Sequence, residues 1–263
     1  MDELGTRMKS YEKTTTSLRL NPELPICARI DGRSFSSFTR GCQKPFDDEI
    51  SNAMRATCAF LVDKTHARIG YVQSDEISLV WQANEGGSVF FDGKVMKMAS
   101  VLASMAGVKF FSAYGGEKLP AFDCRVWQLP SQTEAANAIL WRAIDARKNA
   151  VSSACRAHNS AKSMHKKGRD EQLEMLLQKG IDFEATYSAQ DRHGVFYQRV
   201  TGEKFLDDDT WNKIPDGKKP DNRMVMRSWV AEMPAPYFGD VEDRVSFIFG
   251  DLSENQIAQD KGE

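Results

Sequence analysis

Two carboxylates at the ends of predicted strands are the clearest chemical feature of this sequence. Asp31 ends the short buried strand predicted over residues 26–30, in "ARIDGRSF", and Asp75 lies at the turn between two predicted strands in "RIGYVQSDEISLVW". If these strands are neighbours in a sheet, both acids lie at one edge, where they could hold two divalent metal ions about 3.5–4 Å apart. Oxygen ligands suit Mg²⁺, and Gly32 lets the main chain come close enough for its carbonyl to be a third ligand. Asp is also common at turns for structural reasons alone, so that role stays open for both residues.

Basic and hydroxyl side chains near these acids could bind a triphosphate. Lys44 follows the first acid in "GCQKPFD", and Ser74 directly precedes the second. Lys94 and Lys97 are three residues apart, which places them on one face of a predicted helix. Together these groups could surround a triphosphate beside the metal ions, although each lysine taken singly is compatible with an ordinary surface position.

A basic segment follows in the second half of the chain. Between residues 142 and 169 the only acid is Asp145, whereas eight side chains are Lys or Arg. These are Arg142, Arg147, Lys148, Arg156, Lys162, Lys166, Lys167 and Arg169. A polyanion could bind there, although the net charge of −2 gives no general case for nucleic-acid binding and a basic run is often only a solvated surface.

The elements that must position these groups can be read from periodicity and turn residues. Helices are predicted over residues 47–65 and 92–106, strands over 68–81 and 122–129, and a helix of about 25 residues after the capping box that begins at Ser131. A shorter helix over 170–179, strands over 193–200 and 224–230 and a polar, frayed end from residue 251 complete the chain.

The predicted order β-α-β-β-α-β followed by helices is typical of the ferredoxin-like fold. We therefore expect an α+β protein: a palm-like catalytic domain over residues 1–135, with its helices on one face of an antiparallel sheet, and a helical and β extension over 136–263 packed on the palm.

Composition narrows the class of protein. The chain has 263 residues with 41% hydrophobic and 27% charged residues, as in globular proteins. We find neither an apolar run long enough to cross a membrane nor a leader of the secretory kind, so we expect a cytoplasmic protein without a membrane partner. The five cysteines are scattered and lack the spacing of a zinc site.

Six sequence blocks together resemble the tRNA-His guanylyltransferase family. They are "RIDGRSF", "QKPFD", "GYVQSDEISLVW", "KMASVLAS", "FDCRVW" and "WRAIDARKN". The resemblance implies an enzyme that adds nucleotides to the 5′ end of tRNA, in the 3′→5′ direction, with a polymerase-like palm and two Mg²⁺ ions. It also implies that GTP and ATP are substrates, because ATP activates a 5′-monophosphate before the 3′-hydroxyl of GTP attacks it, and that identical chains assemble as a tetramer.

The resemblance also assigns individual residues. It gives metal binding to Asp31, the Gly32 carbonyl and Asp75, and catalysis to these acids with Glu76. It gives triphosphate handling to Lys44, Ser74 and Lys97, and we add Lys94 and the three residues that follow Gly32. Those three are Arg33, Ser34 and Phe35.

One departure from the family pattern bears on specificity. In "WRAIDARKN" and the residue after it, Arg147 and Ala150 stand where tRNA-His-specific members have a histidine and a second asparagine. We therefore predict the branch that repairs truncated tRNA 5′ ends by template-dependent addition, with tRNA bound by a basic surface. That surface comprises Arg142, Arg147, Lys148, Asn149, Lys166 and Lys167.

Other functions stay open on sequence alone. A tRNA-His guanylyltransferase that adds a G at position −1 would have the same palm. A nucleotidyl cyclase would use the two acids without tRNA, and a non-catalytic RNA-binding module would lack metal binding.

Overall fold

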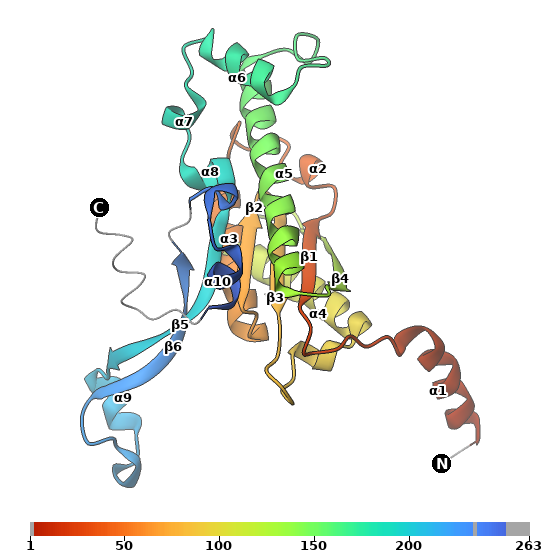
Figure 1. The fold of residues 1–263 in the computed structure, drawn as a ribbon, viewed down its shortest axis with the longest axis vertical. Coiled ribbons are helices and arrows are strands. Elements are labelled where there is room, and N and C mark those ends of the chain that lie inside the picture. Colours follow the sequence, from red (N-terminus) through yellow and green to blue (C-terminus); the bar gives the residue numbers. More distant parts are fainter. Residues whose placement is uncertain (1–2, 234–235, 251–263) are drawn as a thin grey trace.

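A six-stranded sheet runs through the middle of the molecule and carries helices on both faces (Figure 1). The computed structural model describes residues 3–233 and 236–250. The strands are β1 (Ile26–Gly32), β2 (Ile69–Gln73), β3 (Glu76–Trp81), β4 (Phe122–Gln128), β5 (Val195–Phe205) and β6 (Met224–Met233). The longer helices are α1 (Glu3–Thr16), α3 (Asp48–Thr65), α4 (Val95–Tyr114), α5 (Gln132–His158) and α6 (Arg169–Leu177). The shorter ones are α2 (Phe35–Phe38), α7 (Phe183–Thr186), α8 (Ala189–His193), α9 (Asp208–Lys213) and α10 (Arg244–Phe249), with 3₁₀ turns η1 (Phe90–Gly93), η2 (Asp216–Lys218) and η3 (Phe238–Asp240).

The strand order confirms the predicted fold class. Neighbours in the sheet follow the order β4-β1-β3-β2-β5-β6, and every neighbouring pair is antiparallel. The first four strands have the ferredoxin-like order, with β1 and β3 in the centre. β5 pairs with β2, so the second half of the chain extends the sheet that the first half begins.

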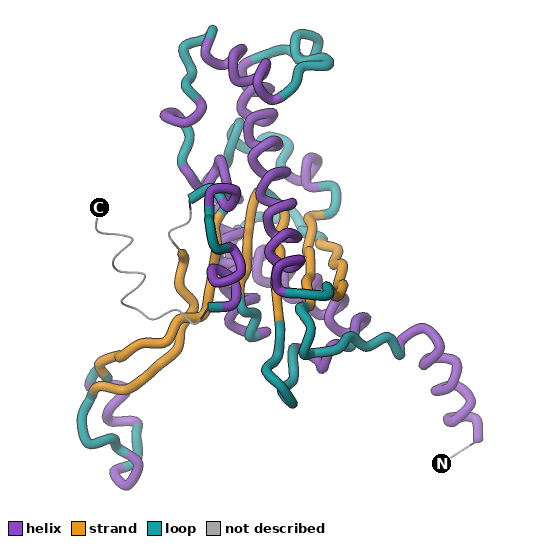
Figure 2. Tube along the Cα trace, in the orientation of Figure 1, coloured by secondary structure: helices purple, strands orange, loops and turns teal. Residues whose placement is uncertain are grey.

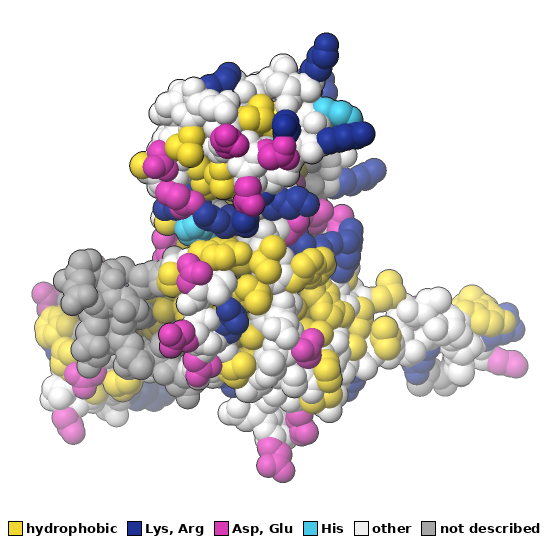
Figure 3. Space-filling model, turned by 45° about the horizontal axis from the view of Figure 1, so that its top comes forward, with side chains coloured by type: hydrophobic (Ala, Val, Ile, Leu, Met, Phe, Trp, Pro, Cys, Tyr) yellow, Lys and Arg dark blue, Asp and Glu magenta, His cyan; other side chains and the backbone are white. Residues whose placement is uncertain are grey.

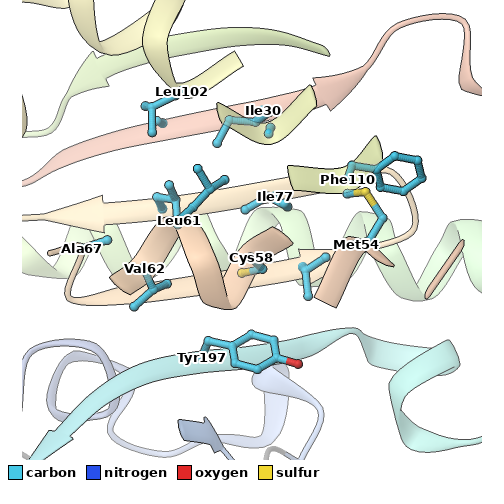
Figure 4. Packing of buried hydrophobic residues seen from close by; sticks show 14 of the residues in the cluster. Ile30, Met54, Cys58, Leu61, Val62, Ala67, Ile77, Leu102, Phe110 and Tyr197 are labelled. Atoms are coloured by element: carbon cyan, nitrogen blue, oxygen red, sulfur yellow. The ribbon is translucent and has the colours of Figure 1, made fainter. Parts of the chain in front are cut away.

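The two faces of the sheet have different partners. On one face α3 and α4 cover Ile30 and Ile77, and Figure 4 shows these side chains among others of that core. On the other face α5 covers Tyr71 and Val80. Because side chains alternate along a strand, Asp31 and its cross-strand partner Glu76 lie on the α5 face.

The helix predicted over residues 92–106 is displaced towards the C-terminus. Phe91 and Asp92 have φ of 49° and 57°, in the left-handed region, so the helix cannot begin there. α4 begins at Val95 and runs to Tyr114, where Gly115 ends it with φ of 71°. In contrast, the long helix begins as predicted, because Ser131 Oγ accepts a hydrogen bond of 3.2 Å from the amide of Glu134.

One helix of the described residues is apolar and long enough to cross a membrane, whereas we expected no apolar run of that length. α4 could cross a membrane by length and composition alone. Its fully buried residues Met98, Leu102, Ala106 and Phe110 instead belong to the core beside α3.

Two projecting segments were not expected. β5 and β6 are longer than predicted and pair as far as Phe205 and Met224, forming an arm that leaves the body and carries α9 and η2 at its tip (Figure 2). α1 also projects and has no buried residue, although Leu4, Met8 and Tyr11 form an apolar stripe at helical spacing. The predicted frayed end from residue 251 lies outside the described residues.

Candidate active site

The two predicted acids meet at one edge of the sheet. Asp31 is the penultimate residue of β1, and the next amide, that of Gly32, donates a hydrogen bond of 3.0 Å to the carbonyl of Asp75. This bond fixes the end of β1 against the β2–β3 turn. The expectation that β1 and the strand pair are neighbours is confirmed by the β1–β3 pairing, and it brings the two acidic residues to the same edge.

Gly32 is required for this close approach. A Cβ at this position would lie 2.5 Å from Cδ2 of Phe35 and 3.0 Å from Cβ of Asp75. Both distances are shorter than an ordinary van der Waals contact. On the other side of the contact, Ser74 has φ of 48°, so the turn reaches Asp75 through a left-handed residue.

Burial makes the two carboxylates costly to ionise. Desolvation, with the charge of Asp31 as a smaller contribution, raises the pKa of Asp75 to about 6. Desolvation and the neighbouring Asp123 raise the pKa of Asp31 as well. The charges of Arg29, Arg125 and Arg142 oppose the shift at Asp31. Among the described residues neither carboxylate forms an ion pair, so a bound cation would add charge compensation at this edge.

The chemistry of this edge fits Mg²⁺. Carboxylate, main-chain carbonyl and phosphate oxygens are its preferred ligands, and it commonly keeps several waters. Asp31, Asp75 and the Gly32 carbonyl would supply the protein ligands. The described part of the chain contains no group of three or more His, Cys, Asp or Glu side chains able to hold a metal, so phosphate oxygens and water would complete the coordination.

Glu76, the residue after Asp75, is bound by an arginine of α5. Both of its carboxylate oxygens accept hydrogen bonds from Arg142 of α5, at 2.6 and 2.7 Å. Burial raises the pKa of Glu76 and Arg142 opposes that effect. Glu76 therefore holds α5 on the sheet. It also lies directly opposite Asp31 on the same face, and its part in catalysis stays a prediction.

Arg142 itself corrects a prediction. We expected it on the tRNA-binding surface, but it is buried and its guanidinium binds Glu76 and Asp145. The reason is the helix face: Arg142 lies between Ile139 and Ala146, which pack on the sheet. The sequence shows that residue 142 is charged, but it does not show that the side chain points towards the sheet.

A cavity of about 390 Å³ opens beside the acid edge. It is lined by Asp75 and Ser74 from the turn, Lys44 from the loop before α3, and Asn149 and Arg156 from α5. Asp47 holds that loop, because its carboxylate accepts hydrogen bonds from the amides of Gln43 and Ile50, at 2.9 and 3.0 Å. The cavity thus brings the predicted groups Lys44, Ser74 and Asn149 together with Asp75, and its two cations suit a polyphosphate.

Arg156 is a site residue that the sequence reasoning counted only as part of the basic segment. Asn149, Ser153 and Arg156 are spaced by four and three residues, so they form one stripe of α5 along the cavity wall. That spacing from Asn149 was the signal available in the sequence. No other described residue forms an ion pair with Arg156.

The three residues after Gly32 differ in burial. Arg33 and Ser34 are exposed at the end of β1, beside the acid edge. Phe35 is buried in an aromatic cluster with Phe38 and Phe110, and it also contributes to the cavity wall.

Lys94 and Lys97 lie elsewhere. The main chain of Lys94 forms an isolated β-bridge with Arg19, which precedes the start of β1. From there α4 runs along the sheet, and its other end approaches β4 near Gly32. Lys97 lies over the ring of Phe91, with Nζ 5.6 Å from the ring centre. Within a single chain, these lysines therefore do not lie at the acid edge. Their spacing in the sequence predicted a shared helix face, but it could not predict which end of the sheet that face approaches.

The remaining residues predicted to bind tRNA differ in whether their side chains are bound within the protein or exposed. Arg147 binds Glu184 and lies over the ring of Tyr237, so its charge is largely used within the protein. Lys148, Asn149, Lys166 and Lys167 are exposed. Figure 3 shows Lys and Arg side chains gathered around the upper part of the molecule, which Figure 1 identifies as α6 and the adjoining end of α5.

The fold and this edge together define a class: an α+β protein with a palm-like sheet that presents two acids beside a cavity suited to a polyphosphate. Residues 5–130 match the model of a family described as "Thg1: tRNAHis guanylyltransferase". Nearly half of this chain is therefore similar to that family, whose members are nucleotidyltransferases.

Two solved structures and two curated relatives show the extent of the similarity. A bacterial tRNA(His) guanylyltransferase (Thg1)-like protein in complex with ATP is 28% identical, with a TM-score of 0.78 over 95% of this chain and 100% of that chain. A bacterial tRNA(His) guanylyltransferase (Thg1)-like protein in complex with GTP is 29% identical, with a TM-score of 0.69 over 93% of this chain and 99% of that chain. An uncharacterized protein of Acanthamoeba polyphaga mimivirus is 30% identical over 57% of this chain. The tRNA(His) guanylyltransferase of Schizosaccharomyces pombe is 29% identical over 52% of it. The chain spans 61% and 54% of the lengths of these two curated relatives.

Proposed function

We propose that this protein adds nucleotides to the 5′ end of tRNA, in the 3′→5′ direction, and repairs truncated ends by copying the opposing strand. The observation that carries the proposal is the meeting of Asp31 and Asp75 beside a cavity lined by Lys44 and Arg156, two cations that form no ion pair with another described residue. The match of residues 5–130 to the family model and the similarity to proteins solved with ATP and GTP support it.

Each group at the edge has a role in this proposal. Asp31, Asp75 and the Gly32 carbonyl hold two Mg²⁺ ions, which when bound lower the pKa of an attacking hydroxyl and neutralise charge on the phosphates. Lys44 and Arg156 bind the phosphates of the nucleoside triphosphate, and the Ser74 hydroxyl orients one of them. A tRNA with a 5′-monophosphate is first adenylated by ATP with release of pyrophosphate; the 3′-hydroxyl of GTP then attacks and AMP leaves. A 5′-triphosphate would need no activation, because its own pyrophosphate leaves.

Repair is favoured over guanylylation of tRNA-His by the position of Arg147. Its guanidinium is bound by Glu184 and Tyr237 and does not project as a base-reading group. The exposed residues Lys148, Asn149, Lys166 and Lys167 would hold the tRNA backbone without reading sequence. Addition of a G at position −1 of tRNA-His remains the second candidate because of the family description.

We also propose that identical chains assemble, as a tetramer, in the cytoplasm. Exposed apolar side chains on α1 and α4 support an interface between copies. They are Leu4, Met8, Tyr11, Met96, Val108 and Phe111. Sedimentation velocity on the full chain would reveal a monomer if this part of the proposal is wrong.

The decisive experiment supplies 5′-truncated and intact tRNAs, all four labelled nucleoside triphosphates and Mg²⁺. We expect addition to truncated tRNA that follows the opposing base, and a requirement for ATP only with 5′-monophosphate ends. Asp75→Asn, a variant of nearly equal size, should abolish addition. Addition limited to one G on intact tRNA-His would favour the second candidate, and cyclic nucleotide formed without RNA would indicate a cyclase.

A further inference from the structure

The α5 face of β1 and β4 carries an exposed tryptophan above a buried charge cluster. Trp141 of α5 is 54% exposed, whereas the side chains of Arg29 and Arg142 are only 15% and 9% exposed. Their guanidinium carbons lie 5.7 and 4.6 Å from the Trp141 ring centre. Both arginines approach Glu76, so the ring covers these cations and is held by them.

A second observation concerns the charges beside this ring. Arg29 of β1 lies directly opposite Arg125 of β4 in the antiparallel register. Like charges in directly opposite positions destabilise a strand pair. Glu76 and Asp123 offset part of this repulsion, at 3.8 and 3.7 Å, yet Nε of Arg29 is buried without a hydrogen-bond partner and the Arg125 side chain is 61% exposed. An anionic group placed here would relieve the remaining repulsion.

The position of this surface relates it to the acid edge. Arg29 precedes Asp31 by two residues on the same strand, so both side chains lie on the same face, about 7 Å apart along β1. A polymer whose end reaches the acids would therefore have its next unit over Trp141. Within residues 3–233 and 236–250 no element buries the ring of Trp141. Exposed aromatic rings beside arginines commonly bind unpaired nucleotides.

We propose that Trp141 is a stacking platform for a base at the 5′ end of the RNA substrate, with Arg125 binding the adjoining phosphate. This inference rests on the proposed function for the identity of the RNA. It adds a recognition element that holds the terminal nucleotide in line with Asp31 and Asp75.

The test measures binding of a tRNA acceptor-stem hairpin with a 5′-monophosphate, without nucleoside triphosphates. Trp141→Ala should weaken binding by about tenfold or more, and Trp141→Phe should keep most of the affinity because an aromatic ring remains. Trp211→Ala is the matched control: Trp211 also lies over a guanidinium, that of Arg223 at 5.1 Å, but on the distant arm. It should bind RNA as the unaltered protein does. Thermal unfolding of all three variants establishes that they are folded.

A fluorescence measurement provides an independent readout. RNA binding should quench tryptophan emission in the unaltered protein and in Trp211→Phe, and quench it much less in Trp141→Phe. Unchanged affinity and quenching in the Trp141 variants would overturn the platform, and a change only in oligomeric state would assign this face to a protein interface. Nucleotide addition separates the two proposals: an inactive protein that still binds RNA through Trp141 refutes only the proposed function.

Discussion

Arg142 and Glu76 form a buried bidentate ion pair that joins α5 to the strand next to the acid edge. Nε and Nη2 of Arg142 donate to the two oxygens of Glu76, at 2.6 and 2.7 Å, and Nη2 also donates to Asp145 at 3.0 Å. Glu76 directly follows Asp75, and α5 supplies Asn149 and other parts of the cavity wall. The pair therefore fixes the distance between the acids and the wall that faces them.

Breaking this pair should destabilise the protein strongly. Arg142→Met leaves the buried Glu76 carboxylate with only the longer contact to Arg29, so we expect the free energy of unfolding to fall by about 3–5 kcal/mol. Urea unfolding followed by circular dichroism measures the change. The double variant with Glu76→Gln should recover much of the loss, because a neutral amide needs no counter-charge. A double variant as unstable as the single one would contradict this account.

Gly32→Ala should damage the acid edge specifically. The added Cβ would press on Phe35 and Asp75, so we expect a loss of about 1–3 kcal/mol in unfolding free energy and a loss of nucleotide addition. Gly107→Ala is the matched control, because Gly107 lies within α4 and its nearest neighbour would be 3.9 Å away. Alanine there should stabilise the helix by about 0.5–1 kcal/mol and leave activity unchanged. Equal effects of the two substitutions would show that Gly32 has no special role.

Sequence reasoning succeeded where local pattern determines structure. Apolar patterns and turn signals predicted the first four strands, β1 to β4, and the end of the first strand placed Asp31 at the edge of the sheet. The pairing of β1 with β3 then follows from the ferredoxin-like order, which is why Asp31 and Asp75 could be predicted to share an edge.

Side-chain direction and long-range placement could not be predicted in this way. The charge of Arg142 is visible in the sequence, but its burial depends on how α5 rotates onto the sheet. Lys97 has the residue type expected for a triphosphate site, but the direction in which α4 crosses the sheet takes it away. α1 has no buried residue, and nothing in its local pattern predicts where such an exposed helix lies relative to the sheet.

Stability should depend on pH through His193. Burial, followed by the charges of Arg192 and Arg147, lowers the pKa of His193 from 6.5 to about 4. Between these values the unfolded chain binds a proton that the folded chain does not, so the free energy of unfolding falls as pH decreases from about 6.5 to 4. His193→Gln should flatten this part of the profile, measured by urea midpoints at several pH values. Parallel profiles for the two proteins would exclude His193 as the cause.

Affinity for tRNA should depend on the exposed lysines near α6 and not on those at the start of α4. Lys148→Glu and Lys166→Glu each remove a cation that can contact phosphate, so each should weaken tRNA binding and reduce the slope of log K against log salt by about 1. Lys97→Glu makes the same charge change at the other end of the sheet and should leave both quantities unchanged. Filter binding at several salt concentrations gives the affinities and slopes. If Lys97→Glu weakens binding as much as the other two, tRNA responds to overall charge or reaches α4, and the surface assigned here is wrong.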